Sequence, residues 1–164
     1  MAWIIEDDCL APERYIKITY RGPNPFSAYQ SSLAICRKYL EIDAADYWER
    51  EFRWDSSEDP RGFYIRSIVQ KSMDSKSKIY FEIIMQGKQP KDSSKEGELV
   101  ILIGAKLTTE YRQETPFQKS EFYKNLLRIY NLFFYFKVRR RYLQLCKELC
   151  EKLRDAYKEL LKIG

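Results

Sequence analysis

Apolar side chains recur at every second position through most of the middle of the chain, in runs that short polar stretches separate. This spacing is typical of strands with one buried and one solvent-exposed face, and the short connections favour antiparallel neighbours. Together with an earlier β-rich run, the pattern predicts five strands, at 15–22, 46–55, 63–73, 78–87 and 98–112.

Helical spacing occurs in two places. Asn24 is expected to cap a first helix with Pro25 in its first turn, and apolar residues then recur every three or four positions up to Leu40. A second helical pattern covers 117–163 without a proline or a glycine. A straight helix of that length would span about 70 Å, so we expect a bend near 131–141.

The order of these elements predicts an α+β fold in a single domain, residues 1–164. A curved antiparallel β-sheet is expected to be wrapped around the long C-terminal helix, with a short helix after the first strand and residues 1–12 as an N-terminal arm. The apolar face of such a sheet needs a cover, and the long helix is the element large enough to supply it. The segment 126–138, which is apolar nearly all round, is therefore predicted to lie inside the curve of the sheet.

The net charge of +5 is unevenly placed. Residues 126–164 hold ten Lys/Arg against four Asp/Glu, whereas the other 125 residues hold nineteen against twenty. The run Arg139, Arg140 and Arg141 has three interpretations: a solvated helix face, a transient contact with an anionic membrane surface, or a nucleic-acid contact. Nucleic acid is the weakest of the three, because no RNA- or DNA-binding motif accompanies the run.

The chain contains no histidine, which excludes Ser-His-Asp and Cys-His catalysis and most catalytic metal sites. It also lacks the glycine-rich motifs that bind phosphates of nucleotides, so no cofactor and no metal are expected. The four cysteines have no zinc-ribbon spacing and are expected to be reduced thiols of a cytoplasmic protein. The N-terminus has neither the basic nor the long apolar region of a secretion signal, and no apolar stretch is long enough for a membrane span.

The order and lengths of the elements resemble the helix-grip fold of the START/Bet v 1-like superfamily, also called SRPBCC. Two stretches carry the likeness: "GELVILIGAKLTTEYR", as a long last strand, and the helical pair "EFYKNLLRIYNLFFYF" and "KVRRRYLQLCKELCEKLRDAYKELL". Two departures are visible. Five strands are counted where the family usually has six or seven, and one helix follows the first strand where two small ones are common.

The resemblance implies an elongated cavity between sheet and long helix that binds a hydrophobic or amphipathic small molecule. The residues expected to contact such a ligand, from their strand parity or their place on the helix, are Arg50, Phe52, Trp54, Ser67, Phe81, Thr109, Tyr111, Tyr130 and Phe134. Arg50 is the sharpest case, because a guanidinium among tryptophans is costly to bury without an acidic partner or an anionic ligand group. The alternative is that Arg50 reaches water. The aromatic residues in turn could simply fill the core and leave no cavity.

Three functions therefore compete. The first is a non-enzymatic carrier of a lipid-like or aromatic molecule. The second is a cyclase- or hydrolase-like enzyme on the same fold, in which Tyr111 or a carboxylate would act as acid or base and Arg50 would steady an anion. The third is a ligand-free interaction module that docks a protein through an exposed apolar patch or through its basic C-terminal helix.

Overall fold

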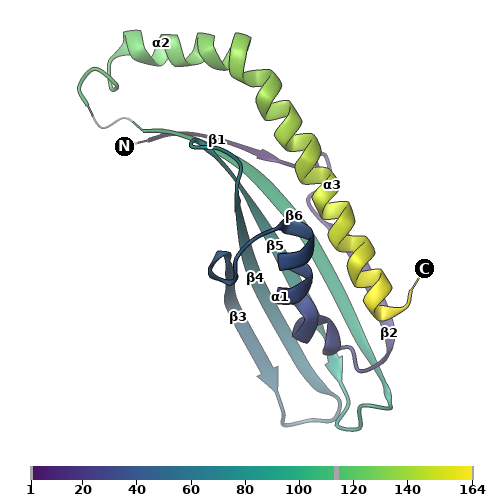
Figure 1. The fold of residues 1–164 in the computed structure, drawn as a ribbon. Coiled ribbons are helices and arrows are strands. Elements are labelled where there is room, and N and C mark those ends of the chain that lie inside the picture. Colours follow the sequence, from purple (N-terminus) through teal and green to yellow (C-terminus); the bar gives the residue numbers. More distant parts are fainter. Residues whose placement is uncertain (1, 113–114, 164) are drawn as a thin grey trace.

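The computed structural model describes residues 2–112 and 115–163 and has an α+β fold, with a curved antiparallel sheet and a long C-terminal helix (Figure 1). Six strands form the sheet: β1 (Ala2–Asp8), β2 (Ile16–Pro23), β3 (Tyr47–Asp55), β4 (Arg61–Ser72), β5 (Ser77–Gln89) and β6 (Glu96–Arg112). The helical elements are α1 (Ser27–Leu40), the 3-10 turn η1 (Ala44–Asp46), α2 (Glu121–Tyr130), the π-helical turn η2 (Asn131–Tyr135) and α3 (Phe136–Leu161).

The sheet is built around β6, its longest strand. The strands follow one another in the order β1-β6-β5-β4-β3, and β2 pairs with β6 as well. β2 pairs with the first half of β6 and β1 with the second half, so these two strands lie end to end along one edge. The segment expected to form an N-terminal arm thus begins with a sixth strand.

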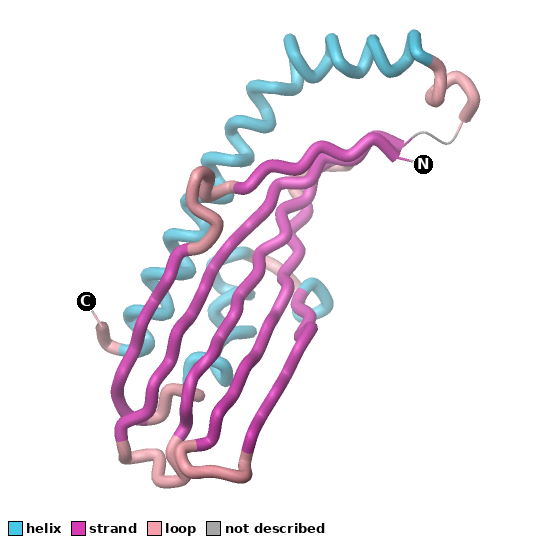
Figure 2. The backbone as a smooth tube through the Cα atoms, turned by 180° about the vertical axis from the view of Figure 1, so that it is seen from behind, coloured by secondary structure: helices cyan, strands magenta, loops and turns pink. Residues whose placement is uncertain are grey.

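The helices α1 and α3 lie on the same face of the sheet. α3 packs against β6, β2 and α1, while Figure 2 shows the opposite face of the sheet, over which no described helix lies. This arrangement follows from the sequence. On the central strands β4 and β5 most of the buried inward residues are apolar, with Ser67, Ser77 and Gln89 as polar exceptions, whereas the outward residues are polar or only half-buried.

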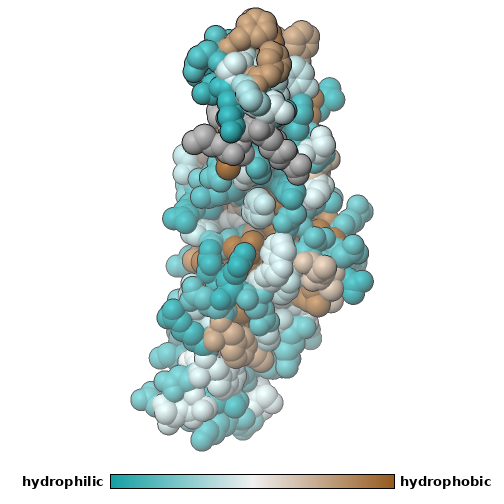
Figure 3. Space-filling view, turned by 90° about the vertical axis from the view of Figure 1, so that its left-hand side faces the viewer, coloured by the Kyte–Doolittle hydropathy of each residue, from teal (hydrophilic) through white to brown (hydrophobic). Residues whose placement is uncertain are grey.

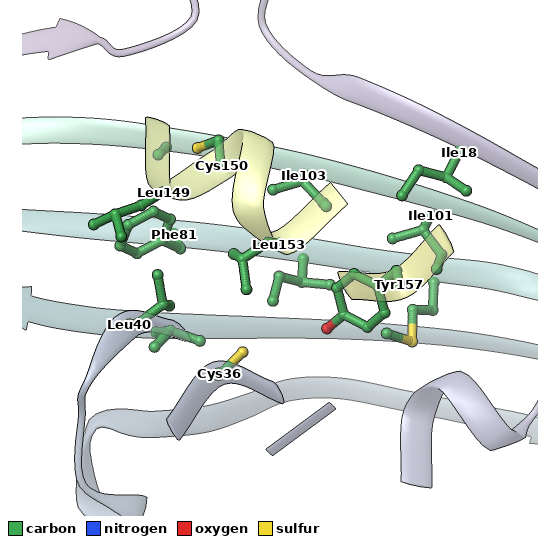
Figure 4. Packing of buried hydrophobic residues seen from close by; sticks show 14 of the residues in the cluster. Ile18, Cys36, Leu40, Phe81, Ile101, Ile103, Leu149, Cys150, Leu153 and Tyr157 are labelled. Atoms are coloured by element: carbon green, nitrogen blue, oxygen red, sulfur yellow. The ribbon is translucent and has the colours of Figure 1, made fainter. Parts of the chain in front are cut away.

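The space between the sheet and α3 is occupied by side chains. Phe81 and Ile103 of the sheet meet Leu149, Leu153 and Tyr157 of α3, and each of these five is at most 5% exposed (Figure 4). The close-up shows these side chains pointing toward one another from the two layers. Dense packing of this kind is what stabilises a domain of this size.

The first helix begins later than the sequence pattern predicts. Asn24 has a positive φ of 48° and belongs to the preceding turn, so α1 starts at Ser27 and Asn24 is not its cap. The helix buries Ala28, Ser32, Cys36 and Leu40. Ser32 takes a place in the core because its hydroxyl hydrogen-bonds to the buried Tyr157 hydroxyl, at 2.7 Å.

The expectation that all cysteines are reduced is wrong for two of them. Cys9, at the end of β1, forms a disulfide with Cys146 of α3, while Cys36 and Cys150 are free and buried. The two partners are 137 residues apart, and spacing along a sequence gives no signal for such a pairing.

The C-terminal helix changes direction at η2. α2 lies across one end of the molecule, and α3 runs down along the sheet (Figure 1). Ser120 caps α2 by accepting a hydrogen bond from the Tyr123 amide. The π-helical turn adds a residue to the helical path, and such turns are common causes of a helix bend.

Candidate functional site

The nine residues predicted to line one cavity lie in three separate environments. Four of them are buried on the helix-covered face of the sheet: Ser67, Phe81, Thr109 and Tyr111. Their polar groups are bonded within the protein. Ser67 accepts from the Tyr47 hydroxyl, Thr109 accepts from Arg139, and Tyr111 donates to Asn131. Each of these three hydroxyl groups is thus already hydrogen-bonded to another residue of the protein.

The predicted site residues on β3 are separated by a β-bulge. The register of β3 against β4 shifts between Glu49 and Glu51, which leaves Arg50 without a partner across the strands. A bulge re-aims the residues around it, so Arg50 is exposed and its guanidinium lies over the Trp48 ring at 5.8 Å. The interpretation of Arg50 as an inward residue is therefore wrong, and the alternative in which it reaches water is correct.

The other two β3 residues lie beside α1. Phe52 contacts the Tyr29 ring in a tilted arrangement and remains 47% exposed, and Trp54 packs against Phe26 and Phe63 at the far end of the sheet. These contacts form an aromatic border to the core.

The last two predicted residues, Tyr130 and Phe134, lie on α2 and η2, which we name the apolar arm (residues 121–135). Their rings stack on each other at 6.1 Å, and Phe134 is 68% exposed. The prediction that the segment 126–138 lies inside the curve of the sheet is wrong for most of its length. The arm extends past the sheet, so its outer side has no strand to cover it (Figure 1).

The outer side of the arm carries a continuous apolar stripe. Phe122, Leu126, Ile129 and Phe133 follow at helical spacing, with exposed fractions from 44% to 66%. Leu132 and Phe136 extend the stripe toward α3. In the space-filling view of Figure 3, hydrophobic residues gather at the end of the molecule that α2 forms. A contiguous apolar patch of large side chains on a protein surface marks a contact site.

The inner side of the arm is fastened to the sheet by specific contacts. Leu127 and Tyr135 are buried, and Asn131 accepts a hydrogen bond from the Tyr111 hydroxyl at 2.6 Å. The outer stripe is therefore opposite to the side through which the arm packs. A buried apolar inner side and an exposed apolar outer stripe together explain why the sequence of this segment is apolar nearly all round.

A lysine and three tyrosine rings form the base of the arm. The Lys76 ammonium, from the β4–β5 turn, lies 4.7 Å from the ring centroid of Tyr130, 5.3 Å from that of Tyr111 and 5.5 Å from that of Tyr135. Each contact is within the range of a cation–π attraction. Because Tyr111 belongs to β6 and the other two rings to the arm, the ammonium joins the arm to the sheet.

Asp74 supports the same junction. One of its carboxylate oxygens accepts from the hydroxyls of Tyr135 and Tyr142, at 2.6 and 2.9 Å. Burial raises the pKa of the Asp74 carboxyl, but the hydrogen bonds it accepts lower that pKa more, and the net direction is downward. Burial and the bond to Asp74 raise the pKa of Tyr135, so this hydroxyl remains a donor at neutral pH.

The three arginines predicted to act together have different environments. Arg139 is 8% exposed, and its guanidinium pairs with Asp7 of β1 and donates to Thr109. Arg140 and Arg141 are exposed. Arg139 is therefore a structural link between α3 and the N-terminal strand, and only its two neighbours are accessible to a partner.

The surface around the arm is strongly basic. Between residues 115 and 141 a single acidic residue, Glu121, occurs beside seven Lys/Arg. Apart from Arg139, the basic side chains are exposed or half-buried: Lys119, Lys124, Arg128, Lys137, Arg140 and Arg141. A surface that combines an apolar stripe with uncompensated positive charge is suited to a partner that is apolar and anionic.

Comparisons with known proteins add no family. No family model matches the chain, and neither does any curated protein. Among solved structures, a protein of unknown function from Staphylococcus aureus aligns over 92% of this chain and 96% of its own length, at 8% identity and a TM-score of 0.26. These values are too low to bear on fold or function, so the function has to be inferred from the chain itself.

The part of the chain that the structure describes contains no helix apolar and long enough to cross a bilayer. The same residues hold no cluster of Cys, Asp and Glu suited to a metal ion. Sequence reasoning found the arm as an apolar segment but missed Lys76 and Asp74, which lie in a polar turn. The one available signal was the "MDSKS" turn itself, whose polar residues look the same whether or not an arm packs on them.

Proposed function

We propose that the protein binds peripherally to anionic membrane surfaces, with the apolar arm lying in the plane of the lipid headgroups. The exposed stripe of Phe122, Leu126, Ile129 and Phe133, flanked by basic residues, is the observation that carries the proposal. Amphipathic helices of this composition insert their apolar side into the boundary between headgroups and acyl chains, and their Lys/Arg residues attract anionic lipids.

The position of the arm favours a partner with a planar surface. α2 lies across one end of the molecule, and the sheet and α3 extend away from it on the other side (Figures 1 and 2). The stripe is thus on the outside of the end of the molecule, where a planar surface can reach it without meeting the sheet. The excess of basic side chains favours an anionic bilayer over a second copy of this chain, which would bring two positive surfaces together.

A carrier function with a ligand inside the protein stays a prediction. The geometry does not support this function, because Phe81, Leu153 and Tyr157 occupy the space between the sheet and α3 that a ligand would need. The architecture is helix-grip-like, and membership of the START/Bet v 1-like superfamily likewise remains a proposal. Lipid recognition through an outer surface rather than an inner cavity is compatible with that membership.

Cosedimentation with vesicles tests the proposal. Wild-type protein is expected to bind vesicles of phosphatidylcholine with phosphatidylglycerol, and to bind pure phosphatidylcholine vesicles much less. The double variant Phe122→Ser/Phe133→Ser should lose about 2 kcal/mol of binding free energy, or about thirtyfold in affinity, because two partly buried phenyl groups are removed. Raised salt should weaken the wild-type binding, since the basic residues are exposed.

Leu33→Ser serves as the matched control, because Leu33 is an exposed apolar residue on α1, away from the arm. Its vesicle binding should equal that of the wild type. Equal binding by the arm variant and the control would contradict the proposal. So would analytical ultracentrifugation that finds a dimer of the wild type, a monomer of the arm variant and no vesicle binding by either, since the stripe would then be an interface between copies.

A further inference from the structure

A polar pocket of about 300 Å³ lies at the junction of the arm with the uncovered face of the sheet. Lys76, Lys78 and Glu110 contribute its charged groups, and Tyr123 of the arm contributes one wall. Lys78 and Glu110 are outward residues of β5 and β6, so most of this pocket lies away from the core, and Tyr111 is the one residue it shares with the predicted inner cavity. Its size is at the lower end for small-molecule sites, which suits a headgroup and not a whole lipid.

The two ammonium groups are available to an anion. Among the described residues neither Lys76 nor Lys78 takes part in an ion pair. The tyrosine rings around Lys76 hold its ammonium in place, but aromatic rings attract a cation without cancelling its charge. A phosphate placed between the two lysines would gain two charge-assisted contacts from groups of which one is already positioned.

Glu110 restricts the kind of anion. A carboxylate at the edge of the pocket would repel a bare phosphate, yet it is a good acceptor for hydroxyl groups. Thr108 and Tyr80 line the same pocket and add hydroxyls that can donate or accept. The combination matches a ligand that carries a phosphate at one end and hydroxyls at the other.

We propose that this pocket binds a phosphorylated polyol, with its phosphate between Lys76 and Lys78 and its hydroxyls toward Glu110. The pocket itself is argued from its own residues, but a lipid source for the ligand rests on the proposed function. If the arm lies on a bilayer, the pocket beside it is close to lipid headgroups. A free polyol phosphate from solution presents the same chemistry.

Titration of the full chain with soluble myo-inositol 1-phosphate, followed by protein NMR, tests the pocket without any membrane. Shifts are expected at Lys78, Thr108 and Tyr123, and Lys78→Ala should weaken binding about tenfold, the effect of removing one charged hydrogen bond. Lys88→Ala is the matched control, because Lys88 is an exposed outward residue of the same strand that lines other pockets. It should leave the affinity unchanged.

Inorganic phosphate and unphosphorylated myo-inositol should each bind more weakly than the combined probe. The proposal is overturned if myo-inositol 1-phosphate does not bind, if Lys78→Ala binds it as well as Lys88→Ala does, or if inorganic phosphate binds equally tightly. The last result would show that the hydroxyl side of the pocket has no part in recognition.

Vesicles distinguish the two sources. Phosphatidylinositol should be compared at equal molar fraction with phosphatidylserine, which has the same net charge but carries no polyol. If the protein binds phosphatidylinositol vesicles more tightly and Lys78→Ala abolishes this preference, the ligand is a lipid headgroup. If both vesicles bind equally and the soluble probe also binds, the ligand is a free polyol phosphate. If the protein binds myo-inositol 1-phosphate but no vesicles, the pocket proposal stands and the membrane proposal fails. If it binds vesicles but not myo-inositol 1-phosphate, the membrane proposal stands and the pocket proposal fails.

Discussion

Asp74 accepts four hydrogen bonds at the base of the apolar arm. Two come from the hydroxyls of Tyr135 and Tyr142, and two from the backbone amides of Lys76 and Ser77. The carboxylate thereby fixes the β4–β5 turn and the end of the arm at the same time. These bonds favour its charged form, which is why the pKa of Asp74 is lowered.

The lowered pKa of Asp74 predicts a pH-dependent contribution to stability. In the unfolded chain this carboxyl titrates at about pH 4; in the folded protein it stays charged to lower pH. Its contribution is therefore complete above about pH 4 and is lost as the pH falls through the folded-state pKa. Asp74→Asn should lower the free energy of unfolding by about 1–3 kcal/mol at pH 7.

Urea denaturation at a series of pH values measures this effect. The difference between wild type and Asp74→Asn should shrink as the pH is lowered below about 4. A difference that stays constant, or grows, toward acid pH would mean that the carboxylate charge is not what stabilises the junction.

Single residues also show where sequence reasoning ends. The period-two pattern of β3 gave Trp48, Arg50 and Phe52 one parity, and a bulge between Glu49 and Glu51 changed it. Backbone register depends on the partner strand, so no spacing within β3 could reveal the bulge. The buried pair of Arg139 with Asp7 was hidden for a similar reason, since 132 residues separate the two.

At the scale of elements, the apolar arm is held to the body of the protein by few contacts. Lys76 lies over three tyrosine rings, of which two belong to the arm, and Asn131 bonds to Tyr111. Beyond η2 the helix is fastened more extensively, with Leu149 and Leu153 in the core. The arm is therefore expected to open locally before α3 does.

Lys76→Met should loosen the arm selectively. The change keeps an unbranched side chain but removes the charge over the rings, which is worth about 1–2 kcal/mol for such a half-buried cluster. Amide hydrogen exchange should accelerate roughly tenfold within 121–135 and stay unchanged within 146–161. Equal acceleration in both segments would show that arm and α3 open together, and no acceleration would show that the cation–π contacts do not hold the arm.

The elements themselves were largely predictable. Alternation of apolar and polar residues identified the strands β3 to β6, a β-rich run identified β2, and the helical pattern identified α1 and the long C-terminal helix. β1, which pairs with the second half of β6, was missed. Its sequence, "AWIIEDD", is acidic at positions where the other strands are apolar. The apolar character of the arm was predicted correctly, but the prediction that the sheet covers it was wrong. Hydrophobic pattern shows that a face needs covering and does not show what covers it.

For the whole molecule, the disulfide between Cys9 and Cys146 ties the N-terminal strand to the C-terminal helix. The bridge closes a loop of 137 residues, and closing a loop of that length in the unfolded chain is worth about 3–5 kcal/mol of stability. The pair of Arg139 with Asp7 joins the same two elements. The two ends of the chain therefore stabilise each other around β6.

Reduction should consequently destabilise the entire domain. Oxidised wild type is expected to exceed both reduced wild type and Cys9→Ala in free energy of unfolding by about 3–5 kcal/mol. Adding reductant to Cys9→Ala provides the control and should have no further effect, because Cys36 and Cys150 are free thiols. An unchanged denaturation midpoint on reduction of the wild type would contradict a stabilising role for the bridge.

The depth of the arm in a bilayer tests the central claim most directly. A nitroxide label attached to Phe133→Cys reports whether that position meets lipid or water, and a label at Lys88→Cys, at the far end of β5, is the reference. With anionic vesicles, the label at 133 should become shielded from a water-soluble nickel complex and more accessible to oxygen, while the label at 88 stays in water. A label at 133 that remains as accessible to the nickel complex with vesicles as without them would contradict the account.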